Sequence, residues 1–225
     1  MVEIIPTCVP QSAEDLQKAG HAISAFARSI HIDIDDDIFT PVLTWPYVER
    51  GKWKEFELGL TGFEIHMHLM TDEPRELGIA FARAGAHSII GHLEGFLDTA
   101  KVPSTLDDWR SGGAKEAGLG VLMHTPLEVL HPLVPSCDFI HFMSIATVGT
   151  QGIPYDSRAP ARIAEFHTRY PEMLISVDGG VSLANIGDLT RAGATRFGVG
   201  SAISKAEDPK AAYEALKAAA ENALQ

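Results

Sequence analysis

The chain has 225 residues, 45% of them hydrophobic, and carries a formal net charge of −12. This acidity argues against a nucleic-acid-binding protein, which would present a basic surface, although a local anion site remains compatible with it. No apolar run of about 20 residues predicts a transmembrane helix. The N-terminus lacks the basic start and apolar core of a secretory signal, and the two cysteines are far apart. We therefore expect a cytoplasmic protein with reduced thiols and without membrane or nucleic-acid partners.

Short apolar runs alternate with helical stretches along the whole chain. Repeated strand–helix alternation indicates a parallel sheet. Eight such units in this length indicate an α/β fold, a single (β/α)8 barrel (a TIM barrel) formed by residues 1–225. The predicted strands are 3–7, 29–35, 63–69, 87–93, 118–124, 137–144, 174–179 and 195–200.

Two helical stretches have recognisable ends. Residues 12–29 begin with Ser12 followed by acidic residues, which is a capping pattern. Residues 72–85 have Pro74 near the start and a glycine after the end, the usual placement of these residues around a helix. Both stretches follow a predicted strand, as the barrel requires.

Two connections depart from the simple strand–helix pattern. Residues 36–60 are longer than a strand–helix connection needs, and we expect a loop over the barrel mouth before the helix begins. Residues 95–117 contain Pro103 and a glycine pair, which predicts a broken helix. The helical stretches 182–193 and 208–224 follow the last two strands.

Polar side chains alternate with isoleucines along the second predicted strand, SIHIDID. His31, Asp33 and Asp35 therefore share one face of that strand. The same spacing places His66 and His68 on one face of the next strand. Because the carboxyl ends of barrel strands meet at one mouth, these side chains are candidates for a shared site.

Two later strands add ligands of the same kind. The fourth predicted strand carries His92 near its end, and the seventh ends in Asp178. Imidazoles and carboxylates that converge in this way can bind Zn²⁺, Fe²⁺, Mn²⁺ or Co²⁺ and leave positions open for substrate oxygens. His31 and His68 are the strongest candidate ligands. His66 and His92 could instead orient the ligands through hydrogen bonds without contacting the metal.

The last two strand–helix loops are rich in glycine. Gly179 and Gly180 follow the seventh strand, and Gly200 and Ser201 follow the eighth. Either pair alone would indicate only a tight turn. Barrels commonly bind phosphate with these two loops, where glycines let backbone N–H groups approach an anion. Together the two loops predict a phosphate site.

These motifs resemble, in order and spacing, those of the ribulose-phosphate 3-epimerase family. The stretch HIDIDDDIFTP at 31–41 is similar to the family pattern His-x-Asp-x-Met-Asp-Gly-x-Phe-x-Pro. Further similar stretches are HLMTDEP (68–74), GAHSIIGHLE (85–94), TPLEVL (125–130) and VDGGVSLANIGDLTRAGATRFGVGSAI (177–203). The resemblance covers nearly the whole chain.

The resemblance implies a metal-dependent barrel that inverts C3 of a ketose phosphate, with D-ribulose 5-phosphate and D-xylulose 5-phosphate as the leading pair. It implies that His31, Asp33, His68 and Asp178 hold one divalent ion, and that the two aspartates also move the proton. It also implies a homo-oligomer. The expected substrate and phosphate contacts are Thr7, Met70, Met143, Gly179, Gly180, Gly200 and Ser201.

Three stretches depart from the family pattern. Asp35 replaces the methionine that follows His-x-Asp, and residues 122–124 replace an Asn-Pro turn. The loop MSIATVGTQG at 143–152 lacks a proline, is shorter, and keeps only Gly149 between Met-Ser and Gln151. In the family this loop closes over the phosphate end, so these differences concern the substrate more than the metal site.

Three alternatives stay open. The protein could be a 3-epimerase of a hexulose phosphate or of an unphosphorylated ketose. It could be a decarboxylase or aldolase on a related barrel, although such enzymes place a lysine beside aspartates near the second strand, and HIDIDDD at 31–37 has none. It could also be a non-catalytic barrel that binds a sugar phosphate.

Overall fold

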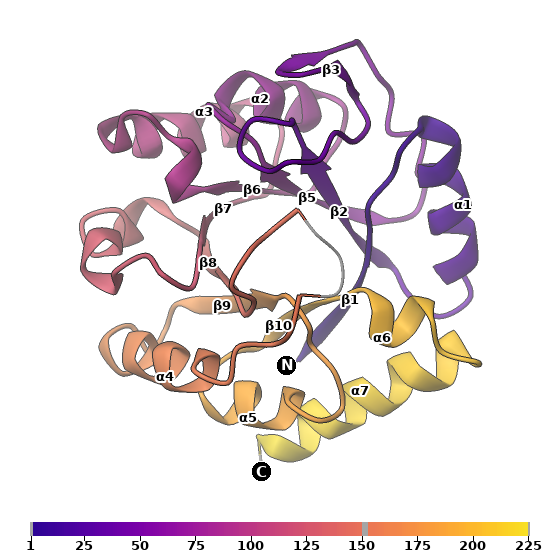
Figure 1. Ribbon diagram of the computed structural model, residues 1–225, viewed down its shortest axis with the longest axis vertical. Helices are drawn as coiled ribbons and strands as arrows, with labels where there is room; N and C mark the ends of the chain where they lie inside the picture. Colours follow the sequence, from indigo (N-terminus) through magenta and orange to yellow (C-terminus); the bar gives the residue numbers. More distant parts are fainter. Residues whose placement is uncertain (1, 150–152, 225) are drawn as a thin grey trace.

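Eight parallel strands close into a barrel in this computed structural model, which describes residues 2–149 and 153–224. The barrel strands are β1 (Glu3–Cys8), β2 (Ser29–Asp35), β5 (Glu64–Met70), β6 (Ser88–His92), β7 (Glu116–Val121), β8 (Phe139–Met143), β9 (Leu174–Asp178) and β10 (Arg196–Val199). Their order around the barrel is β1-β10-β9-β8-β7-β6-β5-β2 (Figure 1). The predicted (β/α)8 fold is confirmed.

Helices surround the strands (Figure 1). They are α1 (Ala13–Ile23), α2 (Arg75–Arg83), α3 (Val102–Gly112), α4 (Ala159–Arg169), α5 (Ile186–Arg191), α6 (Ser201–Ser204) and α7 (Pro209–Ala223). Four short 3-10 turns are η1 (Leu93–Gly95), η2 (Thr99–Lys101), η3 (Leu127–Leu130) and η4 (Val134–Ser136). The Ser12 hydroxyl accepts a hydrogen bond from the backbone N–H of Asp15 at 3.1 Å, which confirms the predicted cap of α1.

The segment between β2 and β5 differs from the prediction. No helix forms there; instead β3 (Tyr47–Glu49) and β4 (Lys52–Trp53) pair as an antiparallel hairpin (Figure 1). Gly51, in the turn of this hairpin, has a φ of 65°, a left-handed conformation that glycine adopts without strain. The predicted helix in this connection was therefore wrong.

Two further connections also differ. Pro103 lies in the first turn of α3, where a missing N–H costs nothing, so this helix is continuous rather than broken. Between β7 and β8 the chain forms only the 3-10 turns η3 and η4, within a proline-containing stretch, instead of an α-helix.

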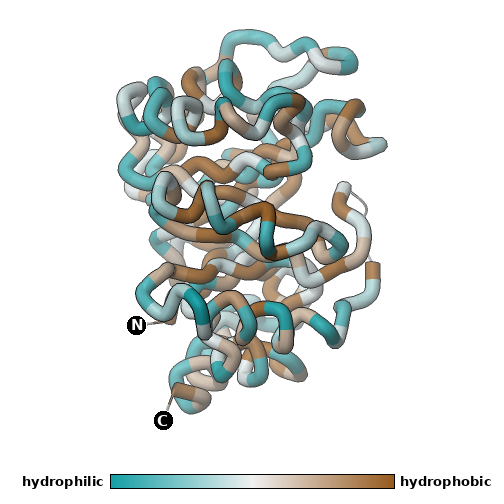
Figure 2. The backbone as a smooth tube through the Cα atoms, turned by 90° about the vertical axis from the view of Figure 1, so that its left-hand side faces the viewer, coloured by the Kyte–Doolittle hydropathy of each residue, from teal (hydrophilic) through white to brown (hydrophobic). Residues whose placement is uncertain are grey.

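The two faces of the barrel strands have different chemistry. In β2, Ile30, Ile32 and Ile34 are fully buried in the apolar layer between the strands and the helices. Figure 2 shows hydrophobic and hydrophilic residues interleaved along the whole chain, as half-buried strands and helices require. The inner face is polar instead. Here Arg196 of β10 reaches Glu116 of β7 across the barrel, so these side chains fill its interior.

The register of β2 and β5 places the polar side chains of these strands next to one another. The two strands pair along their whole length, with Asp33 opposite His68 and His31 opposite His66. Residues paired in register point to the same side of the sheet, so both sets face the interior. Among the helices of the described chain, none is long and apolar enough to cross a membrane.

Candidate active site

The four side chains predicted as metal ligands lie together at the carboxyl ends of β2, β5 and β9. His31 Nε2 is 3.2 Å from Asp33 Oδ1 and 3.7 Å from Asp178 Oδ2. His68 Nδ1 is 2.9 Å from the same Asp33 oxygen. Both imidazoles and Asp33 are buried, and Asp178 is nearly so. The structure therefore brings the four predicted residues into one cluster.

On the side of the His68 ring that faces away from Asp33, polar contacts link this residue to His92 and Glu94. Its Nε2 lies 2.8 Å from Nε2 of His92, and His92 Nδ1 lies 3.4 Å from Oε2 of Glu94. Burial would raise the pKa of Glu94, but the contact with His92 and hydrogen bonds from Thr125 and the Leu122 backbone lower it to about 2. An ionised Glu94 favours a proton on His92 Nδ1. When a metal is bound, His92 Nε2 would accept the Nε2–H of His68, and the His68 Nδ1 lone pair would face the ion.

The two aspartates have opposite electrostatic environments. Burial would raise the pKa of Asp33, but the adjacent imidazoles of His31 and His68 outweigh burial and lower it. Burial, together with the negative charge of Asp33, raises the pKa of Asp178. The backbone N–H of Gly179 donates to Asp178 Oδ1 at 2.5 Å and fixes the orientation of this carboxyl group. Neighbouring carboxyl groups with opposed pKa shifts are a common feature of acid–base sites.

A third buried histidine joins the cluster, and the sequence analysis missed it. The His141 ring of β8 lies 4.7 Å from that of His68 and 5.5 Å from that of His31, between centroids. The ligand atoms of His31, His68, His141 and Asp178 all lie within 4.8 Å of one another. The available signal was the spacing: His141 stands two residues before Met143 and so shares its inward face.

A cavity of about 580 Å³ opens beside this cluster. Its lining consists of Val9, Gln11, Asp33, Asp35, Pro41, Val42, Met70, Met143, Ile145, Val148, Gly149, Asp178 and Gly179. No lysine or arginine belongs to this described lining. Asp35 is buried and accepts a hydrogen bond from the Thr40 hydroxyl at 2.7 Å. Burial, reinforced by the nearby Asp33 and Asp36, raises the pKa of Asp35 to about 7.

The predicted substrate contacts fall into two groups. Met70, Met143 and Gly179 line the cavity. The others, Thr7, Gly180, Gly200 and Ser201, lie outside this lining. Thr7 and Gly200 are close to each other, because a Cβ at Gly200 would lie 2.7 Å from the Thr7 hydroxyl oxygen. Gln151, in the unusual loop after β8, lies outside the described residues.

The cluster fits a divalent metal ion. It offers imidazole nitrogens and carboxylate oxygens, the donor set that suits Zn²⁺, Fe²⁺, Mn²⁺ and Co²⁺. The Nε2 atoms of His31 and His141 are buried without a hydrogen-bond partner in the described part of the chain. Such orphaned atoms are uncommon in protein interiors, and a bound cation would satisfy both.

Solved structures of other enzymes share this fold. The chain aligns with 3-hexulose-6-phosphate synthase from Salmonella typhimurium at a TM-score of 0.64 and 15% identity, over 98% of this chain and 99% of the other. It aligns with orotidine 5'-phosphate decarboxylase from Lactobacillus acidophilus at a TM-score of 0.61 and 16% identity, over 97% and 99%. At these identities the likeness concerns the barrel alone.

Sequence relatives are more specific. A ribulose-phosphate 3-epimerase from Mycobacterium leprae is 31% identical over 201 residues, which is 87% of this chain and 85% of that protein. One from Escherichia coli is 31% identical over 208 residues, covering 91% and 88%. The model of the ribulose-phosphate 3-epimerase family matches residues 3–204. The chain therefore belongs to the ribulose-phosphate 3-epimerase family and is an isomerase of that family.

Proposed function

We propose that this isomerase inverts C3 of a ketose phosphate, with D-ribulose 5-phosphate and D-xylulose 5-phosphate as its substrate and product. The observation that supports this most strongly is the pair of aspartates, Asp33 and Asp178, beside a cluster of buried imidazoles at the barrel mouth. Family membership adds the reaction type, because relatives that match most of the chain are ribulose-phosphate 3-epimerases.

In this proposal the residues that hold the divalent metal are His31, Asp33, His68 and Asp178. When bound, the metal supplies Lewis acidity that stabilises the negative charge formed when the C3 proton, next to the ketone, is removed. One aspartate takes that proton from one face of the carbon, and the other returns a proton to the opposite face. Strands β1 and β10 separate β2 from β9, so the two carboxyl groups reach the site from different sides.

The rest of the mouth would orient the sugar and limit the access of water. The apolar side chains of Met70, Met143 and Val148 pack together beside the aspartates, and apolar cover of this kind keeps water from a reactive carbanion-like carbon. We assign the phosphate to the backbone N–H groups of Gly179–Gly180 and Gly200–Ser201, in the two loops that commonly bind phosphate in such barrels. The homo-oligomer and the cytoplasmic location stay predictions.

Rates on matched sugars test the substrate. Metal-loaded protein should convert D-ribulose 5-phosphate with kcat/KM at least about 100-fold above that for D-ribulose, because remote phosphate contacts contribute to transition-state binding. Chelation should abolish the activity and an added divalent ion should restore it. Steady-state kinetics on both sugars provides the measurement. Equal kcat/KM values for the two sugars would show that the enzyme does not recognise the phosphate group and would contradict the proposed substrate.

A second candidate, 3-epimerisation of an unphosphorylated ketose, has its own support. Asp35 stands where relatives of this type carry methionine, and the described lining of the cavity holds three aspartates without a cationic side chain. A carboxylate at this position would repel a phosphate group and accept hydrogen bonds from a sugar hydroxyl.

The substitution Asp35→Met tests whether the Asp35 carboxylate keeps the phosphate ester out of the site, as the second candidate requires. Measured above about pH 8, where the Asp35 carboxyl with its pKa raised to about 7 is ionised, the substitution should lower KM for the ketose phosphate about tenfold, because nearby like charges repel by roughly 1–2 kcal/mol. Bound metal, measured by elemental analysis, should stay unchanged. Asp35→Asn is the matched control, since it removes the charge and keeps the shape. Loss of metal in both variants would instead make Asp35 a ligand.

A further inference from the structure

We propose that His141 is itself a ligand of the metal centre, so that this protein binds its ion with three imidazoles together with aspartate oxygen. The inference rests on the proposed function only in assuming that an ion binds at this mouth. It adds a ligand from β8, a strand from which neither the family motifs nor the sequence analysis takes one.

The first argument is position. In the barrel order β8 lies opposite β2, yet the rings of His141 and His31 stack 5.5 Å apart at 23°, so they meet across the interior. The ring of His68 is 4.7 Å from that of His141. Two nitrogens bound to one zinc-like ion lie at most about 4.2 Å apart, since each bond is about 2.1 Å. The ligand atoms of this cluster lie at most 4.8 Å apart. Small side-chain shifts would therefore bring them to the distances of metal-bound ligands.

The second argument is orientation. Ser176 of β9 places its hydroxyl oxygen 2.9 Å from Nδ1 of His141. The other ring nitrogen, Nε2, is buried and has no hydrogen-bond partner among the residues described. Metal-bound histidines usually donate their second ring N–H to a fixed partner, which sets the tautomer and aims the free lone pair at the ion. Ser176 is such a partner for His141.

His66 shows that burial alone does not produce this arrangement. It is also an interior histidine, 1% exposed, and its Nε2 also lacks a partner in the part of the chain that is described. However, it lies two residues before His68, toward the opposite end of the barrel, where its ring is 5.7 Å from that of His87. Its ligand atom instead lies within 4.8 Å of carboxylate oxygens of Glu3 and Glu64 at that end, so His66 is a control for a buried histidine outside the mouth cluster.

A third imidazole has a consequence for metal choice. Nitrogen-rich sites favour Co²⁺ and Zn²⁺ over Mn²⁺ more strongly than sites dominated by carboxylates do. The preference for Co²⁺ over Mn²⁺ should therefore depend on His141. A histidine with only a packing role would leave this ratio unchanged.

The test measures metal affinity of the full chain, stripped with a chelator and titrated with Co²⁺ or Mn²⁺ against a competing chelator. His141→Gln should weaken Co²⁺ binding at least about 100-fold and reduce the Co²⁺/Mn²⁺ preference, because losing a ligand exceeds the roughly 10–100-fold effect of losing an outer partner. Ser176→Ala should weaken it about tenfold. His66→Gln should bind Co²⁺ like the wild-type protein, and circular dichroism checks the fold of every variant.

Proton NMR of the Co²⁺-loaded wild-type protein gives a second readout. Each bound imidazole contributes an exchangeable, strongly shifted N–H signal, and one such signal should vanish in His141→Gln and shift or exchange faster in Ser176→Ala. If His141→Gln fails to fold, the response of Ser176→Ala decides. Unchanged signals and affinities would overturn the role of His141 and leave the metal site standing. Absence of Co²⁺ binding by the wild-type protein would overturn the metal site itself.

Discussion

Asp33→Asn and Asp178→Asn should each lower kcat/KM for epimerisation by about 10⁴-fold, the upper end of the range for losing a positioned acid or base. Each substitution removes a group that carries a proton to or from C3 and also a carboxylate oxygen proposed to hold the metal. The imidazole of His31, 3.2 Å from Asp33 and 3.7 Å from Asp178, connects both losses to one centre. We therefore expect neither variant to be rescued by excess metal alone.

Solvent isotope exchange distinguishes the two aspartates. With saturating metal in deuterated water, each variant should retain exchange at C3 for at most one of the two epimers, since each carboxyl group serves one face of the carbon. Asp188→Asn is a suitable control, because this carboxyl group lies exposed on α5 and pairs with Arg191 at the surface. Wild-type turnover in either active-site variant would contradict the two-aspartate mechanism.

The polar faces of β2 and β5 explain why much of this site could be predicted from the sequence. Alternation along a strand is a local property, so SIHIDID placed His31 and Asp33 on one face without knowledge of the partner strands. The strand order then brought Asp178 to the same mouth, as the barrel topology requires. Asp35 was also placed correctly at the cavity, because it follows Asp33 at the same spacing.

His141 could not be chosen in the same way. It stands between Ile140 and Phe142 in a strand that otherwise has an apolar sequence, a pattern as typical of a packed core histidine as of a ligand. Its role depends on rings from β2 and β5 across the barrel and on Ser176 from β9. Those contacts depend on tertiary structure, which no single strand encodes.

The fold predictions failed where a connection left the strand–helix pattern. Between β2 and β5 a helix was expected from the pattern alone, although Pro41 and Pro46 disfavour one. Tyr47, Val48 and Trp53 are residues that favour strands, and Gly51 supplies the turn, so this local chemistry produces the β3–β4 hairpin. In this connection the strand preference of the local residues outweighed the strand–helix repeat of the barrel.

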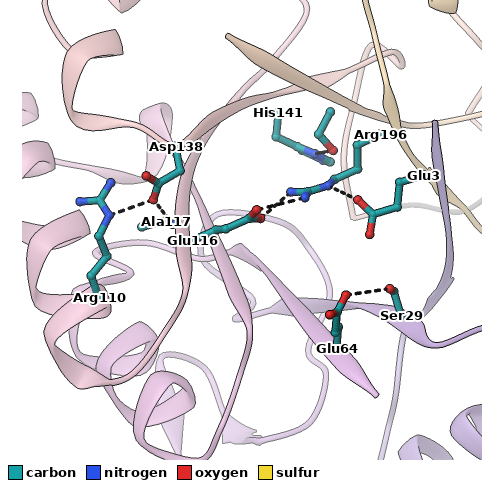
Figure 3. Close-up of polar contacts among 10 residues, drawn as sticks. Glu3, Ser29, Glu64, Arg110, Glu116, Ala117, Asp138, His141 and Arg196 are labelled. Carbon is teal, nitrogen blue, oxygen red and sulfur yellow. Dashed lines mark hydrogen bonds and ion pairs between the residues drawn. The ribbon is translucent and has the colours of Figure 1, made fainter. Parts of the chain in front are cut away.

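Arg196→Met should lower the free energy of unfolding by about 3 kcal/mol, the lower end of the range for breaking a buried ion pair. The guanidinium group lies at the amino-terminal end of the barrel, where Nε is 2.6 Å from Glu3 and Nη1 is 2.7 Å from Glu116 (Figure 3). It also lies over the Phe139 ring, 5.0 Å from the centroid. The substitution would leave two carboxylates from β1 and β7 without a cation inside the barrel.

The exposure of the partners sets the size of this effect. The Arg196 side chain is 8% exposed, whereas those of Glu3 and Glu116 are 32% and 27% exposed and keep some hydration when the cation is lost. This partial hydration is why we expect the lower end of the range rather than its upper end of about 5 kcal/mol. Adding Glu116→Gln to the variant should recover part of the loss, because it removes one of the two unpaired charges.

Urea unfolding of metal-free protein, compared at equal m-values, measures the change. Arg191→Met is the matched control, because Arg191 forms its ion pair with Asp188 on the surface, where both side chains are more than half exposed. Exposed pairs contribute about 0–1 kcal/mol, so this control should stay within that range. Equal effects of the two arginine substitutions would mean that the polar layer inside the barrel does not stabilise the fold. A large effect confined to Arg196 would mean that the stability of the barrel depends on the paired charges at its amino-terminal end. The carboxylates and imidazoles at its carboxyl-terminal end would then be available for the reaction.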